Sequence, residues 1–295
     1  MAGIFGFFDY TKPGKGVSKE DVNKKGISLY FDILLRRFWK LITLSMIYII
    51  ASIPAIIIGW FISTFLASWA AAQAGINIEE AATALNLLGI MLTIVFLHIC
   101  GSGPATAALT YVLRKYANDT HAWVWTDFKD SFKNNFKQGI AVYLINTMVL
   151  FLLIFSFLFY SYAQITPVFY VLRAMIIVMA ALFYMMQMYV YQMIASFELN
   201  LKHIYKNAFL LTLVSLPKNI LTPIVSGGII YAVFSVTMRV PLIGILLIGL
   251  LLYPLITYTQ IFMTNNTVKK YMLQPLSNQN SDEPKNEDFD SDFED

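Results

Sequence analysis

One short stretch of this chain has the residue types to bind a polar solute inside an otherwise apolar segment. It interrupts the apolar run from Leu85 to Leu113, and its members are His98, Gly101, Ser102, Gly103, Pro104 and Thr106. Proline removes a helical N–H and the glycines loosen the backbone before it, which predicts a broken helix. Such a break frees backbone groups that bind solutes in many transporters. A kink whose small residues pack against a neighbouring helix would satisfy the same pattern, so both interpretations stay open.

A second pattern is a short internal repeat. Its copies are Phe128, Lys129, Phe132, Lys133, Asn134 and Phe136, and then Leu201, Lys202, Tyr205, Lys206, Asn207 and Phe209. In each copy apolar residues recur at i, i+4 and i+8, which on a helix makes one apolar stripe with lysines beside it. We therefore expect amphipathic helices over Asp127 to Gln138 and Glu198 to Pro217, lying at the inner membrane face.

These two helices either complete the bundle or dock a cytoplasmic partner. The candidate docking residues are Phe128, Phe132, Lys133, Phe136, Glu198, Tyr205, Lys206, Phe209 and Pro217.

The chain shows no pattern typical of a catalytic, cofactor or metal site. His98 has no acidic residue within its apolar run, and His121 and His203 lie in polar connections. No two histidines stand four residues apart, and no glycine-rich phosphate loop is present. We expect a protein that is not an enzyme, with no catalytic, cofactor or metal residues. The apolar runs also hold no carboxylate for ion coupling, so any transport would use a partner ATPase or facilitation.

The polar stretch around Pro104 and the two repeat copies lie within or between six apolar runs. The runs are Leu41 to Leu66, Leu85 to Leu113, Ile140 to Tyr162, Val168 to Phe197, Ile220 to Met238 and Pro241 to Met263. Each is near or above the roughly 20 residues that cross a bilayer. Of the 21 Lys and Arg residues, all but Arg173 and Arg239 fall outside these runs in alternate gaps or at the two ends. The positive-inside rule then predicts a multi-pass protein of the cell membrane with both termini in the cytoplasm.

Composition supports the same class. Apolar residues make up 58% and charged residues 13% of the chain, and the mean hydropathy is +0.62, whereas about 25% of residues are charged in a soluble domain. We expect an all-α membrane bundle of six transmembrane helices and two amphipathic connecting helices. Its parts would be a basic segment over 1–40, a transmembrane domain over 41–270 and a disordered acidic tail over 271–295. No nucleic-acid partner is implied, because the basic residues fit anionic lipid.

The chain resembles one known family. Gly103 to Leu109, Tyr111 to Lys115, Asp127-Phe128 and Phe132 to Gly139 look like the signature of the YesL-like bacterial membrane proteins, and Phe197 to Leu199, Lys206 to Ala208 and Leu216-Pro217 fit it too. That family has no established activity. Its genes tend to lie beside genes for carbohydrate uptake and degradation, so the resemblance implies a role around sugar use and supplies no catalytic residues.

A second resemblance concerns the later repeat copy. Glu198, Val214, Leu216 and Pro217 have spacings similar to the ends of the cytoplasmic loop of permeases in the ATP-binding cassette class. In those permeases the loop inserts into an ATPase subunit.

Two hypotheses follow from these patterns. The first is a permease-like or accessory component of carbohydrate uptake, whose partner is a transport ATPase or a sugar permease. The second is a membrane scaffold or regulatory protein that transports nothing. A transporter requires a solvated path near Gly101 to Thr106, whereas a scaffold should be packed shut there.

Overall fold

The computed structural model describes residues 26–162 and 167–274, which are helical and contain no strand. The N-terminal residues and the acidic tail beyond Gln274 lie outside the described residues. The chain divides into two compact units, residues 1–38 and 39–295. In the first unit, the segment predicted as basic and polar contains the helix α2 (Ile27–Arg36). Within α2, Asp32 and Arg36 form an i,i+4 ion pair of 3.8 Å, a spacing that supports the helix.

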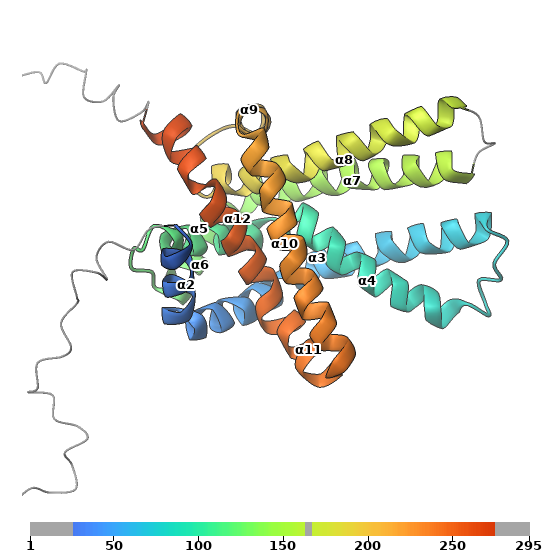
Figure 1. Ribbon diagram of the computed structural model, residues 1–295, viewed down its shortest axis with the longest axis horizontal. Coiled ribbons are helices and arrows are strands. Elements are labelled where there is room, and N and C mark those ends of the chain that lie inside the picture. The colour runs from blue at the N-terminus through green and yellow to red at the C-terminus, as the bar shows by residue number, and fades with distance from the viewer. Residues whose placement is uncertain (1–25, 163–166, 275–295) are drawn as a thin grey trace, which may run out of the picture. The chain divides into compact units, whose positions relative to one another are not determined.

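The second unit is a succession of helices joined by short connections (Figure 1). The elements in order are α3 (Phe38–Gln73), α4 (Ala82–Cys100), α5 (Pro104–Ala117), α6 (Val124–Asn134), α7 (Phe136–Tyr162), α8 (Pro167–Ile194), α9 (Leu201–Val214), α10 (Leu216–Arg239), α11 (Pro241–Leu247), the π-helical turn η2 (Ile248–Leu252), α12 (Tyr253–Val268) and the π-helical turn η3 (Lys269–Leu273). Among residues 26–162 and 167–274, six segments are long and apolar enough to cross a membrane, which confirms the predicted all-α, six-span class.

The second apolar run is divided, as its glycines and proline predicted. The membrane-spanning candidate is α4 alone, with 19 residues. The rest of the run forms α5, in which almost every side chain is buried. The small residues Ala105, Ala107 and Ala108 are fully buried and let other helices approach closely. The expectation of one broken span over Leu85 to Leu113 was therefore wrong for its second half, which is a separate core helix.

Both repeat copies are helical, but their boundaries differ from the prediction. The first copy begins at Val124 and ends at Asn134, and after Asn135 the chain enters α7 directly. The second copy covers Leu201 to Val214, and after Ser215 the chain enters α10. The expected helices over Asp127 to Gln138 and Glu198 to Pro217 are thus interrupted. Each copy is a short helix that leads through one residue into a span.

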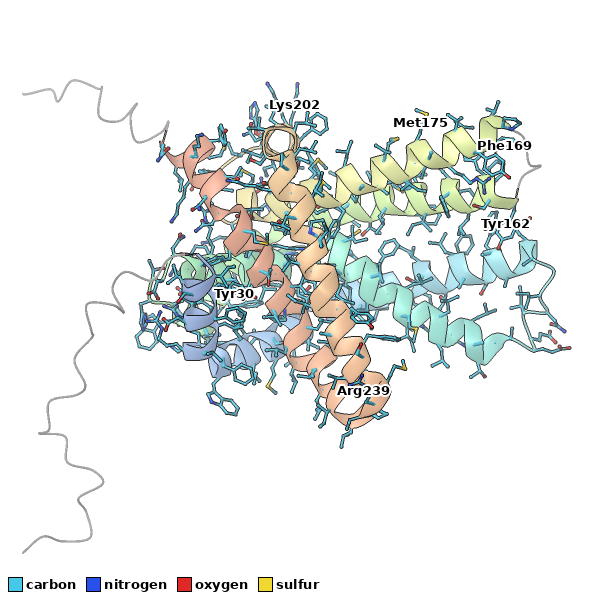
Figure 2. The ribbon with its side chains drawn as sticks, in the orientation of Figure 1. Tyr30, Tyr162, Phe169, Met175, Lys202 and Arg239 are labelled. Atoms are coloured by element: carbon cyan, nitrogen blue, oxygen red, sulfur yellow. The ribbon has the colours of Figure 1, made fainter. Side chains whose placement is uncertain are left out.

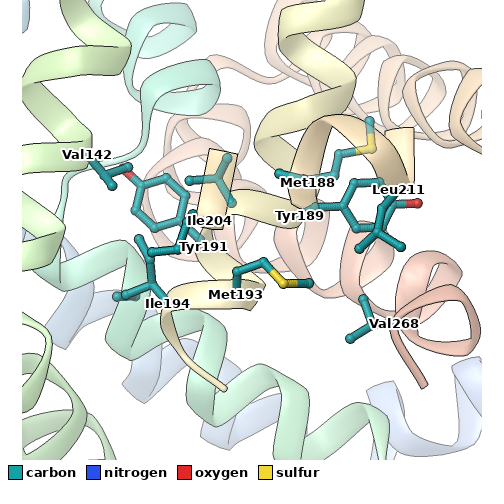
Figure 3. Close-up of a cluster of buried hydrophobic side chains, with 12 residues drawn as sticks. Val142, Met188, Tyr189, Tyr191, Met193, Ile194, Ile204, Leu211 and Val268 are labelled. Atoms are coloured by element: carbon teal, nitrogen blue, oxygen red, sulfur yellow. The ribbon is translucent and has the colours of Figure 1, made fainter. Parts of the chain in front are cut away.

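The core of the second unit surrounds the last two turns of α8. Every residue from Gln187 to Ile194 is buried, so this part of the helix is enclosed on all sides. Figure 3 shows Tyr191 beside Val142 of α7 and Tyr189 beside Leu211 of α9. Val268 of α12 belongs to the same cluster. We call this part, together with α6 and α9, which carry Lys129, Lys133, Lys202 and Lys206, the basic end of the unit.

Far from the basic end, α3 and α4 and the hairpin of α7 and α8 pack through apolar side chains. Leu66, Phe96, Leu150 and Phe183 form one buried cluster from these four helices. The Trp69 ring lies 4.9 Å from that of Phe155 and 6.2 Å from that of Tyr162, with the distances taken between centroids. Figure 2 places Tyr162 and Phe169 at this far end, and it places Lys202 and Arg239 near opposite ends of α10.

Candidate functional site

The break between α4 and α5 depends on two glycines. Gly101 and Gly103 have φ angles of 71° and 68°, a left-handed region that other residues enter at a cost. A Cβ atom on Gly101 would lie 2.6 Å from the Tyr191 hydroxyl. From α7, Gly139 approaches so closely that its own Cβ would lie 2.6 Å from the Pro104 nitrogen. The break is therefore held between the backbone of α7 and the Tyr191 side chain of α8, which leave no room for a Cβ atom at Gly139 or Gly101.

A cluster of hydroxyl groups fills the space beside the break. The Ser52 hydroxyl of α3 donates to Ser102 Oγ over 2.7 Å. Thr106 Oγ1 accepts the Ser102 backbone N–H over 2.7 Å and lies 3.1 Å from Ser102 Oγ. The hydroxyls of Tyr48 and Tyr253, whose rings are stacked 4.5 Å apart, both lie 3.4 Å from Thr106 Oγ1. These groups bond one another, and Thr106 satisfies the Ser102 backbone N–H.

A carbonyl group freed by the break, that of Cys100, is also occupied. The Tyr191 hydroxyl donates to the Cys100 carbonyl oxygen, and Asn146 Nδ2 lies 3.5 Å from the same oxygen. Asn146 and Gln187 exchange amide hydrogen bonds of 2.7 and 3.2 Å, and the Tyr205 hydroxyl donates to Asn146 Oδ1 over 2.8 Å. Asn146 is fully buried. This amide pair joins α7, α8 and α9 next to the break.

His98 lies one turn before the break and contacts α8. Its Nε2 is 3.1 Å from the Tyr184 hydroxyl, which also accepts a hydrogen bond from Gln260 Nε2. His98, Gly101 and Thr106 line an internal cavity of about 30 Å³. A water molecule needs roughly 10–15 Å³ of such space, so this cavity has room for two or three waters at most. A sugar does not fit at the break in this conformation, and the predicted broken-helix residues are packed shut.

A far larger concavity lies at the basic end. It has a volume of about 780 Å³, within the range of roughly 300–1,000 Å³ that is usual for ligand sites. One side is α6 and the start of α7, and the other is the end of α8 with its connection to α9. We call it the α6–α8 groove, and its lining residues are Tyr111, Asp127, Asp130, Ser131, Asn134, Asn135, Gln138 and 194–200.

Hydrogen bonds and one ion pair fix the sides of the α6–α8 groove. Gln138 Nε2 donates to the Leu199 carbonyl over 2.5 Å, which ties α7 to the connection after α8. Asp127 accepts the Trp123 backbone N–H over 2.9 Å and pairs with Lys115 over 2.9 Å. Burial lowers the pKa of Lys115, but its contacts with Asp127 and Tyr111 outweigh burial and raise that pKa above its usual value. The positive charge of Lys115 thus balances the negative charge of Asp127.

The structure separates the predicted docking residues into two groups. Phe128 is buried, and Tyr205 bonds Asn146, so these two side chains contribute to the core. The others are exposed or half-buried, and they are Phe132, Lys133, Phe136, Glu198, Lys206, Phe209 and Pro217. The rings of Phe128, Phe132 and Phe136 form a continuous series with centroids 6.3 and 5.7 Å apart, as the i, i+4 spacing predicted. Only Glu198 of these nine residues lines the α6–α8 groove.

Several polar residues of the site were missed by sequence analysis. Asn146, Gln187 and Gln192 are buried amides inside apolar runs, and Tyr189 donates to Asn219 over 2.6 Å to join α8 to α10. A polar residue inside an apolar run was the available signal, because such residues are costly in lipid and face the protein interior. Among the described residues, no group of three or more His, Cys, Asp or Glu could hold a metal ion.

One protein-family description matches part of this chain. A family described as "Protein of unknown function, DUF624" matches residues 82–157. No curated protein and no solved structure matches the chain. The matched segment contains α4, the break, α5 and α6 and most of α7, so it covers the closed break and one side of the α6–α8 groove.

Proposed function

We propose that this protein is a membrane-embedded docking subunit that holds a cytoplasmic protein in the α6–α8 groove. The observation that carries this proposal is the contrast between the two concavities of about 780 and 30 Å³. A groove of that size accepts a few residues of a partner, whereas the break admits only water. The positive-inside distribution of Lys and Arg favours a cytoplasmic position for the groove. The YesL-like resemblance favours an accessory role in carbohydrate uptake, with a transport ATPase or sugar permease as partner.

The groove variants Asp130→Asn and Glu198→Gln, combined, are expected to reduce recovery of the partner at least about 10-fold, because charge-assisted contacts at an interface are worth roughly 1.5–3 kcal/mol. The measurement is quantitative mass spectrometry of tagged protein purified from native membranes in mild detergent. Glu79→Gln is the matched control, since this exposed carboxylate lies in the connection between α3 and α4, away from the groove.

A protein recovered equally with wild type, control and double variant would not be bound through the groove. Recovery of only the subunit itself, under conditions that preserve other membrane complexes, would overturn the proposal.

A permease-like function is the second candidate. It is favoured by the uncharged polar groups at the break, where Gln192 is almost fully buried and its Oε1 has no hydrogen-bond partner in the described part of the chain. Such groups would suit a neutral polar solute once the surrounding helices separate. This function requires a second conformation in which the break opens, whereas docking requires none.

A further inference from the structure

The α6–α8 groove has an acidic lining, although Arg114 and Lys115 lie beside it, against the rings of Phe197 and Tyr111. All the charged side chains that line it are carboxylates, namely Asp127, Asp130 and Glu198. The exposed lysines of the repeat copies point elsewhere, because none of Lys129, Lys133, Lys202 and Lys206 belongs to the lining. The acidic lining therefore contrasts with the lysines that α6 and α9 carry outside it.

Two of these carboxylates are available to a partner. Asp127 is paired with Lys115, but Asp130 and Glu198 form no ion pair within residues 26–162 and 167–274. Both are exposed, Asp130 on α6 and Glu198 on the opposite side of the groove. A cationic side chain lying between them could bond either carboxylate, whereas an anionic lipid headgroup would be repelled.

The rest of the lining favours the same charge. The α8 helix ends at Ile194, and this last residue lines the groove, so the negative end of the helix dipole lies beside the occupant. Tyr111 and Phe197 add aromatic rings, and rings of this kind attract guanidinium groups. The Phe197 ring already has the Arg114 guanidinium carbon 5.8 Å from its centroid. Amide side chains of Asn134, Asn135 and Gln138 complete the polar surface.

We propose that the α6–α8 groove binds a segment of the partner protein that carries arginine or lysine, with Asp130 and Glu198 as its two anchoring carboxylates. This inference rests on the proposed docking function and names the chemistry of the docked segment. Arginine fits best, because its planar guanidinium binds carboxylates in a bidentate manner and stacks on aromatic rings.

The test uses the full chain in nanodiscs of zwitterionic phosphatidylcholine, which has no net charge, and a fluorescein-labelled peptide of six Arg-Gly repeats. Fluorescence anisotropy should show saturable binding that weakens at least about 10-fold in Asp130→Asn/Glu198→Gln and is unchanged in Glu79→Gln. The carboxylates of the acidic tail are present in all three proteins, so the difference between variants reports the groove. A peptide of six Glu-Gly repeats should not bind.

Equal affinity of the arginine peptide for wild type and the double variant would overturn the inference, as would binding of the glutamate peptide at the groove. Failure of this inference can be distinguished from failure of the docking proposal. Loss of the native partner in the double variant without loss of arginine-peptide binding would retain docking and reject the cationic segment. Peptide binding that depends on the groove, with no native partner recovered, would retain the groove's preference for cationic segments and reject the docking function.

Discussion

Replacing Gly139 by alanine is expected to destabilise the protein by about 1–3 kcal/mol, the usual cost of inserting atoms into a packed interior. The new Cβ would lie 2.6 Å from the Pro104 nitrogen and 2.8 Å from its Cα. Both atoms are backbone, so neither can rotate away, and α7 would have to move off the break. The measurement is thermal unfolding in detergent. Its readout is the fraction of heated protein that still elutes as a monodisperse species on size-exclusion chromatography.

Gly227→Ala is the matched control. Gly227 lies within α10, and a Cβ there would meet no atom within 4 Å. Alanine also has the higher helix propensity, so this variant should unfold at or slightly above the wild-type temperature. A Gly139→Ala protein as stable as wild type would show that the break is not clamped by α7.

Replacing Asn146 by leucine is expected to cost about 2 kcal/mol. The substitution leaves the Gln187 amide and the Tyr205 hydroxyl without the partner that they bond at 2.7 to 3.2 Å. An orphaned buried polar group costs roughly 1–3 kcal/mol in soluble proteins, and coupling energies within membrane bundles average about 0.6 kcal/mol. The midpoint of urea or SDS unfolding reports the loss.

Asn86→Leu provides the comparison, because the exposed Asn86 side chain bonds the Ala82 carbonyl of its own helix. Its effect should stay within about 0.5 kcal/mol. The double variant Asn146→Leu/Gln187→Leu should recover part of the loss, since removing both partners leaves fewer unpaired groups. Strictly additive losses would mean that the two amides are not coupled.

The spans and the helix break were predictable because their signals are local. Pro104 cannot continue α4, and the residue pattern before it already contains the two glycines that adopt positive φ. Helical spacing likewise identified the aromatic series from Phe128 to Phe136. The interruption at Asn135 was not predictable, because the apolar period continues through it and only the packing of α7 sets the change of direction.

The closed state of the break and the α6–α8 groove could not be predicted, because both arise from contacts between distant segments. Asn146 and Gln187 come from different spans, and nothing in either run indicates that they face one another. The groove exists only because α6 lies opposite the connection after α8. Glu198 was predicted as a docking residue, but Asp130 was not. The position of Asp130 in the groove depends on which face of α6 lines it.

The most direct test of this account is cysteine accessibility in membrane vesicles of defined orientation. Cys100 is the chain's single cysteine and is fully buried at the break, whereas Asn134 is exposed in the groove. In inside-out vesicles, Asn134→Cys in a Cys100→Ala background should react with a membrane-impermeant maleimide about 100-fold faster than Cys100 in wild type, because open states of folded proteins are roughly 0.1–10% populated. In right-side-out vesicles neither should react.

Labelling of Cys100 as fast as that of the groove cysteine would contradict the account and favour an open path at the break. Labelling of the groove cysteine from the outside would place the groove on the wrong side of the membrane for a cytoplasmic partner.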